Sequence, residues 1–194
     1  MAAMLGGLAW LLLVPAAVLQ RLGLLDYDGY NRLLAGPLLL FLVALLTAPR
    51  ALMVPGRSVR AGFGVAAVGV GLLLAGNVVE FYGVLLQDER NAYAAARVGE
   101  ADHWVGSDIG WIIFGIGMLV LLVGGLTAAV ALQRRRMRPL WVIAFTATLG
   151  VGVVAANLFA LQSVLLSVPV LALYAAGWIG FGLLMFRRGV SRPA

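Results

Sequence analysis

The sequence predicts an all-α integral membrane protein that crosses the bilayer six times, with both termini in the cytoplasm. Apolar residues make up 63% of its 194 residues, whereas charged residues make up only 11%. An ordinary soluble chain has about 25% charged and about 45–50% apolar residues, so this chain lacks the polar side chains that cover a water-facing globule. The mean hydropathy of +1.02 agrees. Soluble enzymes and extended disordered proteins are therefore excluded.

Six apolar segments are long enough for membrane helices, which need about 20 residues to cross the hydrocarbon core. The stretch from Leu140 to Phe186 is too long for one crossing at about 1.5 Å per residue, so it is expected to fold back near residues 162–167. The expected helices of this single transmembrane domain, residues 1–194, are 2–20, 33–54, 61–98, 107–132, 139–162 and 164–186.

The distribution of charge predicts how these helices are oriented. Cytoplasmic loops of membrane proteins retain an excess of positive charge. Ten of the fourteen arginines follow the second, fourth or sixth expected helix, so both termini are expected in the cytoplasm. The carboxylates agree, because seven of the eight lie in the opposite loops and the eighth, Glu80, lies in the outer half of the third helix. The chain is therefore expected to be a multi-pass protein of the cytoplasmic (inner) membrane.

Missing residue types narrow the chemistry. The chain has no cysteine and a single histidine, His103. Disulfides, iron–sulfur clusters and haem held by two histidines are thereby excluded. The formal net charge of +6 would suggest a nucleic-acid partner in a soluble protein, but membrane insertion and anionic lipid headgroups explain the arginines here. Membrane lipids are expected partners, nucleic acid is not, and the sequence identifies no cofactor.

Small residues recur at regular spacing and predict how the helices pack. Lipid provides no hydrophobic drive between membrane helices, so close backbone approach through small residues holds such bundles together. The third helix repeats glycine every seven residues, the fourth helix does the same, and the sixth helix carries a similar small-residue face. These sets are Gly62, Gly69, Gly76 and Gly83; Gly110, Gly117 and Gly124; and Ala172, Ala176 and Gly180.

Glu80 is the residue around which a functional site is predicted. It lies four residues after Gly76 and three before Gly83, so helical geometry places it on the glycine face, turned toward protein. A carboxylate within the membrane is costly and by default indicates a ligand, ion or proton site. The alternative is a carboxylate that reaches the interface and pairs with Arg90 or Arg97. The other expected ligand-binding residues are Asn77, one turn earlier, Asn157 on the fifth helix, Tyr82 and Trp111.

The longest polar connection, residues 88–108, carries a second candidate site. Its Glu100, Asp102, His103 and Asp108 offer three oxygens and one nitrogen, which is a reasonable ligand set for zinc or manganese. Their spacing matches no metal-binding signature. A solvated acidic loop that binds no metal is the competing interpretation.

Three functions follow from these observations. The leading hypothesis is a small membrane transport or solute-binding component with an outward-facing polar site near Glu80. The first alternative is a non-catalytic subunit of a larger membrane complex, which would dock other chains or a second copy through its glycine faces and its outer loop. The second is a metal-dependent membrane enzyme that uses the loop around His103. The sequence favours the two non-enzymatic roles and leaves the substrate open.

Overall fold

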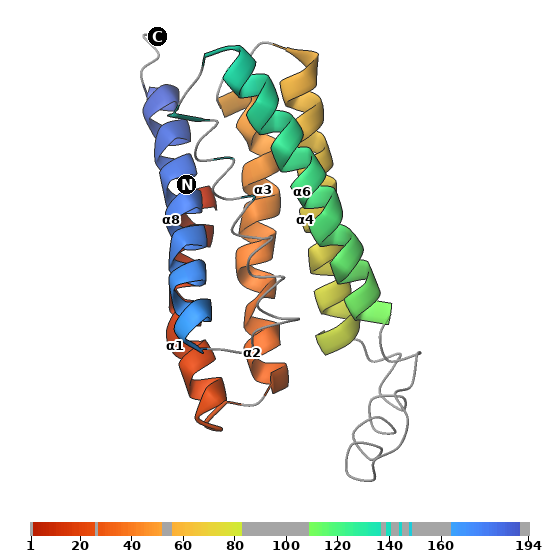
Figure 1. Ribbon diagram of the computed structural model, residues 1–194, viewed down its shortest axis with the longest axis vertical. Helices are drawn as coiled ribbons and strands as arrows, with labels where there is room; N and C mark the ends of the chain where they lie inside the picture. Colours follow the sequence, from red (N-terminus) through yellow and green to blue (C-terminus); the bar gives the residue numbers. More distant parts are fainter. Residues whose placement is uncertain are drawn as a thin grey trace.

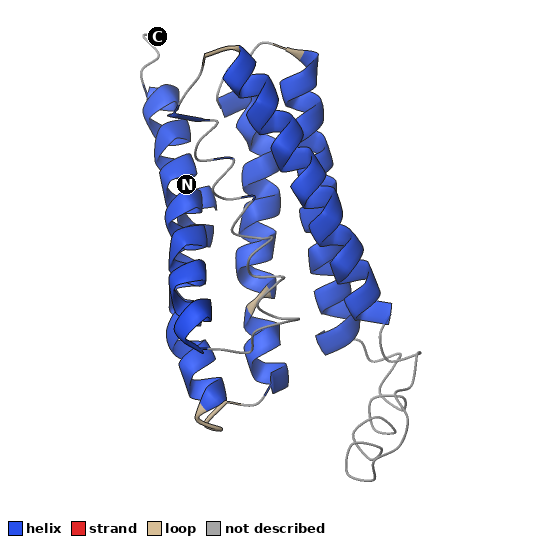
Figure 2. Cartoon of the chain, viewed as in Figure 1, coloured by secondary structure: helices blue, strands red, loops and turns tan. Residues whose placement is uncertain are grey.

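The computed structural model describes residues 2–25, 27–51, 56–82, 109–136, 139–140, 144, 148 and 164–190. The regular structure within these ranges is entirely α-helical, which confirms the predicted all-α class (Figure 2). The helices are α1 (Ala2–Arg21), α2 (Tyr27–Leu33), α3 (Ala35–Ala51), α4 (Arg57–Tyr82), α6 (Ile109–Arg134) and α8 (Val164–Val190).

Three described helical segments are long and apolar enough to cross a membrane. They comprise Asn31–Arg50, with 20 residues, and Arg57–Tyr82 and Ile109–Arg134, with 26 residues each. At about 1.5 Å per residue, 26 residues extend about 39 Å, which exceeds a hydrocarbon core of about 30 Å. The outer face of α6 is apolar along its whole length, as expected against lipid: its exposed side chains include Ile112, Ile116, Leu119, Val123, Leu126 and Val130.

The long helices lie roughly along one axis, with α1 and α4 running in one direction and α3, α6 and α8 running in the other (Figure 1). In that view α4 and α6 form one side of the bundle, α1 and α8 form the other, and α3 lies between them. The C-terminal ends of α3, α6 and α8 and the start of α4 lie together at one end, the upper end in Figure 1. We call it the arginine end, because the described segments there carry Arg50, Arg57, Arg60, Arg134, Arg135, Arg136 and Arg187.

Several helix boundaries differ from those expected, and two of the differences have a clear local cause. Residues 27–33, expected as a loop, form the short helix α2, which passes into α3 through a turn in which the Leu34 amide donates to the Asn31 carbonyl at 3.1 Å. Proline fits the first turn of the next helix, where amides lack intrahelical partners, so Pro37 lies there without cost. The other difference is the start of α4 at Arg57 rather than Ala61, directly after Gly56, whose φ of 135° favours glycine.

The most extensive helix contact, between α4 and α6, is closed by the predicted glycines. A Cβ atom added to Gly69 would lie 2.6 Å from the Cα of Leu121, and one added to Gly117 would lie 2.7 Å from the amide nitrogen of Leu73. Gly62 and Gly124 are equally close to the facing backbone. The glycine seam is therefore confirmed at its described positions, while Gly83 lies outside the described residues.

The opposite side of the bundle is packed by aromatic rings. Phe41 of α3 stacks on Trp178 of α8, with ring centroids 3.9 Å apart, and meets Tyr174 edge to face at 5.6 Å. Helix α1 approaches these rings through Gly6, which lies against Phe41, and Gly7, which lies against α8.

The small-residue face expected on the last helix is wrong at Ala176. This residue is exposed, whereas Tyr174, Ala175 and Trp178 are buried. The large aromatic rings bury more apolar area than the small residues would, so they determine which side of α8 faces the other helices.

Candidate functional site

Asn77 is the most deeply buried of the predicted site residues. Its exposed fraction is 1%, and its side-chain nitrogen Nδ2 donates to the main-chain carbonyl of Asn31 at 2.9 Å. This bond fixes the orientation of the amide, because turning it over would bring two oxygens together. The other amide atom, Oδ1, is buried and has no hydrogen-bond partner among the described residues. An unpartnered buried acceptor costs about 1–3 kcal/mol, so it is a position where a ligand atom is favoured.

Two further hydrogen bonds tie α2 to the end of α4. Arg32 Nε donates to the carbonyl of Phe81 at 2.9 Å, and the Tyr82 hydroxyl donates to the carbonyl of Arg32 at 2.7 Å. The last carbonyls of a helix have no partner within it, so Arg32 supplies a donor that α4 itself lacks. We call Asn31, Arg32, Asn77, Phe81 and Tyr82 the α2–α4 cluster.

Glu80 lies beside this cluster and packs against α6. A Cβ atom added to Gly110, in the first turn of α6, would lie 2.6 Å from the Cβ of Glu80 and 2.7 Å from its carboxylate oxygen Oε2. The side chain is half-buried. It is therefore turned toward a neighbouring helix, and only a residue without a side chain fits opposite it at position 110.

The remaining predicted site residues divide into two groups. Trp111 takes part in aromatic packing, edge to face with Phe81 at 5.8 Å and with Phe114 at 5.6 Å, and Tyr82 is 48% exposed. The others lie outside the described residues: Asn157, Glu100, Asp102, His103 and Asp108. Within the described ranges, no group of three or more histidine or acidic side chains is placed to hold a metal ion.

Sequence reasoning missed the part played by Asn31 and Arg32. Asn77 and Tyr82 donate to the main-chain carbonyls of these two residues. Every residue has such a carbonyl, so the residue type does not show which carbonyl will accept a bond. The available signal was Arg32 itself, a cation close to the start of an apolar segment that is long enough to cross a membrane. Such a cation within a span usually has a partner in the protein.

The chemistry around Asn77 and Glu80 is that of an acceptor site. The two residues are three positions apart on one helix, so their side chains lie on neighbouring parts of the same face. Asn77 Oδ1 and the Glu80 carboxylate both accept hydrogen bonds and both attract positive charge. The arrangement suits a cation, a proton or the donor group of a small polar molecule.

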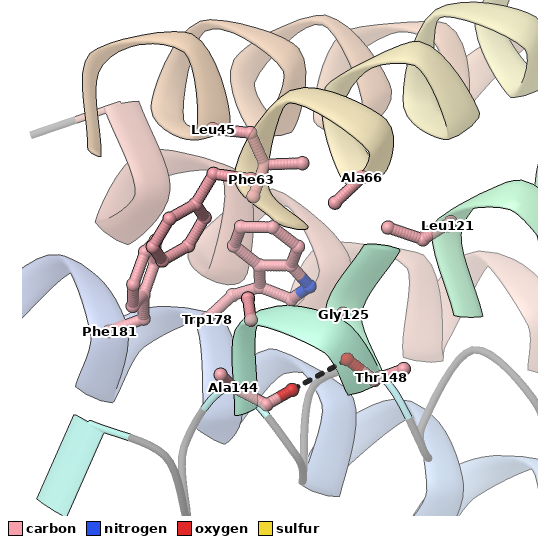
Figure 3. A pocket seen from close by; sticks show the side chains of 10 residues that line it. Leu45, Phe63, Ala66, Leu121, Gly125, Ala144, Thr148, Trp178 and Phe181 are labelled. Atoms are coloured by element: carbon pink, nitrogen blue, oxygen red, sulfur yellow. Dashed lines mark hydrogen bonds between the residues drawn. The ribbon is translucent and has the colours of Figure 1, made fainter. Parts of the chain in front are cut away.

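A small cavity lies among the aromatic rings, toward the arginine end of the bundle (Figure 3). Its volume is about 30 Å³, and its walls include Phe63, Trp178 and Phe181. A water molecule needs about 10–15 Å³ measured in this way, so the cavity has room for water and for nothing much larger. Trp178 Nε1 is buried there and has no hydrogen-bond partner of good geometry among the described residues, whereas the Thr148 hydroxyl donates to the Ala144 carbonyl at 2.6 Å.

Comparisons with models of protein families, with curated proteins and with solved structures found no match to this chain. The structural class of the protein is therefore assigned from its fold alone. It is an all-helical protein with three long apolar helices that are able to span a membrane.

Proposed function

We propose that this protein is a small membrane transport or solute-binding component, and that its binding site is centred on Asn77 and Glu80. The observation that carries the proposal is the buried Oδ1 of Asn77, which has no partner in the described part of the chain and lies one turn from a carboxylate that faces α6. Membrane proteins keep an intramembrane carboxylate where it serves ions, protons or substrates. The Asn77 amide already donates one hydrogen bond through Nδ2, and a ligand that brings a hydrogen-bond donor would also give its Oδ1 a partner.

The acceptor character defines the class of solute. A cation or a molecule with an N–H or O–H donor satisfies both oxygens, whereas an anion is repelled by the Glu80 carboxylate. Asn157 is the proposed third contact from another helix, and Tyr82 and Trp111 would border the entrance. Solute entry is proposed from the end of α4 that lies opposite the arginine end, because Glu80 is only two residues from the end of that helix.

The proposal includes a membrane topology of six crossings in the cytoplasmic membrane, with both termini inside. It is supported by the arginine end, where the described ends of α3, α6 and α8 bring their arginines together. Reporter fusions after Val98 and after Ala194 test this topology. We expect an outside reading at the first position and an inside reading at the second, and an inside reading at Val98 would refute the orientation.

The binding site is tested by native mass spectrometry of protein extracted gently from its membrane. Wild-type protein is expected to retain a small molecule or ion. Glu80→Gln should keep the fold and lose this added mass, because the shape is retained while the charge is removed. Asp28→Asn is the matched control, since it removes a carboxylate from α2, at the same end of the bundle, and leaves Asn77 and Glu80 in place. An added mass that survives in Glu80→Gln would contradict the proposal.

A second function, docking as a subunit of a larger complex, is favoured by another observation. Gly64 and Gly71 of α4 are also seven residues apart, but a Cβ atom added to either would meet nothing within 4 Å. They form a small-residue stripe on the outer side of α4, of the kind that accepts another helix. The same mass measurement distinguishes this function, because it predicts stably bound foreign chains or a second copy in place of a small molecule.

A further inference from the structure

An open groove at the arginine end combines cationic and apolar walls. It has a volume of about 550 Å³ and lies between the start of α4 and the end of α6. Ser58, Arg134 and Arg135 line its polar part, and Leu126 and Val130 line its apolar part. This groove is separate from the Asn77 and Glu80 site, which lies at the other end of α4.

The backbone at the end of α6 and at Gly56 shapes the place where the groove carries Arg135. The end of α6 is tightened by two short-range bonds, Arg135 N to Leu132 O at 3.2 Å and Arg136 N to Gln133 O at 2.8 Å. The guanidinium of Arg135 lies directly over Gly56, where an added Cβ atom would be 2.7 Å from its Cζ. Gly56 therefore makes room for this cation beside the α3–α4 connection.

The described helices supply no acidic residue at the arginine end. No aspartate or glutamate occurs between Asp28 and Glu80 or after Asp108. The acidic residues of the described helices are Asp28 and Glu80, in segments at the opposite end of the bundle. Within the described part of the chain the groove therefore has no acidic partner, so an anionic molecule would supply its counter-charge.

The arrangement of the cationic and apolar walls along α6 indicates what kind of anionic molecule fits the groove. Leu126 lies about 12 Å below Arg134 along α6, at 1.5 Å per residue. An anionic group placed at Arg134 and Arg135 would thus continue into an apolar wall that runs toward the centre of the membrane. A soluble phosphate has no apolar part that could contact this wall. A phospholipid has a phosphate at the membrane surface and an acyl chain that extends toward the membrane centre, so it matches both parts of the groove.

We propose that this groove binds one anionic phospholipid, with its phosphate on Arg134, Arg135 and the Ser58 hydroxyl and its acyl chain along Leu126 and Val130. Guanidinium groups bind phosphate oxygens through paired hydrogen bonds, which gives the site specificity for the headgroup as well as attraction. The lipid would link α4 to α6 at the end where the glycine seam begins.

The test uses the full chain reconstituted into vesicles made of equal parts of phosphatidylcholine and phosphatidylglycerol. After extraction into a neutral detergent, native mass spectrometry counts the lipids that remain bound. We expect one phosphatidylglycerol per chain, and at least about a tenfold loss in the double variant Arg134→Gln, Arg135→Gln. Ser58→Asp keeps both arginines and repels the phosphate, so it should cause the same kind of loss and guards against misfolding of the double variant.

The control is the double variant Arg50→Gln, Arg60→Gln, which removes two positive charges from the same end at residues that do not line the groove. Equal loss in this control would show diffuse attraction and overturn the proposal. Displacement of the lipid by inorganic phosphate alone would assign the groove to a soluble anion and would also overturn it. Equal retention of both lipids would do the same.

Discussion

The α4–α6 side and the α1–α3–α8 side of the bundle are held together by different atoms. Between α4 and α6 the contacts run from backbone to backbone across Gly62, Gly69, Gly117 and Gly124. On the other side, large rings fill the space, and Phe41 lies between Trp178 and Tyr174.

The difference shows two ways to gain packing energy without a hydrophobic drive. Removing side chains lets two helices approach closely along their whole length, so each turn adds many weak contacts. Interlocking aromatic rings concentrate the same kind of energy in a few residues. A seam of the first kind is intolerant of added atoms, whereas a cluster of the second kind is intolerant of removed atoms.

The sharpest test of this contrast is Gly69→Leu, for which we expect the largest effect. Gly69 lies against the backbone of Leu121, which cannot move aside as a flexible side chain does. Overpacking usually costs about 1–3 kcal/mol, and here we expect at least about 3 kcal/mol. Gly71→Leu is the matched control, because the space around Gly71 is open. Thermal aggregation in detergent measures both, and equal midpoints would break the comparison.

Phe41→Ala tests the aromatic side. Phe41 is fully buried and in contact with two other rings, so its removal leaves a cavity and is expected to cost about 3–5 kcal/mol. Leu46→Ala on the same helix is the control, because Leu46 is 62% exposed. Aggregation midpoints that rank Leu46→Ala as the more damaging change would show that the rings do not hold this side.

A smaller effect is expected from Tyr82→Phe, which removes one hydrogen bond from the α2–α4 cluster. The lost bond to the Arg32 carbonyl is partly accessible to water, so about 1 kcal/mol of stability should disappear. Faster hydrogen exchange at the amides of α2, without change in α6, would place the loss in this cluster. Unchanged exchange in α2 would mean that the hydroxyl does not contribute.

The smallest effect should come from Trp178→Phe. The variant keeps an aromatic ring near Phe41 and removes a buried N–H for which the described residues offer no partner of good geometry. Loss of an unsatisfied donor offsets the loss of ring area, so we expect a change within about 1 kcal/mol. A destabilisation close to that of Phe41→Ala, seen in the same aggregation assay, would show that the indole nitrogen has a partner in the cavity.

The two sides also differ in how well a sequence predicts them. The seam follows from the repeat of glycine every seven residues, because this period maps directly onto one helix face. The pairing of Phe41 with Trp178 has no such period and depends on which helices become neighbours. For that reason the small-residue face expected on α8 was wrong at Ala176.

The candidate site was predictable in part for the same reason. The spacing of Glu80 relative to Gly76 predicted that its side chain faces another helix. Asn77 was predicted as a site residue because it lies about one turn before Glu80 on the same helix. The partner of Asn77 did not follow, because it is a carbonyl of α2, a helix too short to show any apolar period. The roles of Asn157 and of the loop around His103 remain predictions from the sequence.

A seam closed by main-chain atoms also bears on how this protein can change during evolution. Every residue has the same backbone, so the outward-facing positions of α4 and α6 are free to drift among apolar residues while the fold persists. Selection would act mainly to keep glycine at the few positions where the two backbones meet. Two chains descended from one ancestor could therefore keep this helix pair while sharing little sequence beyond the seven-residue spacing of their glycines.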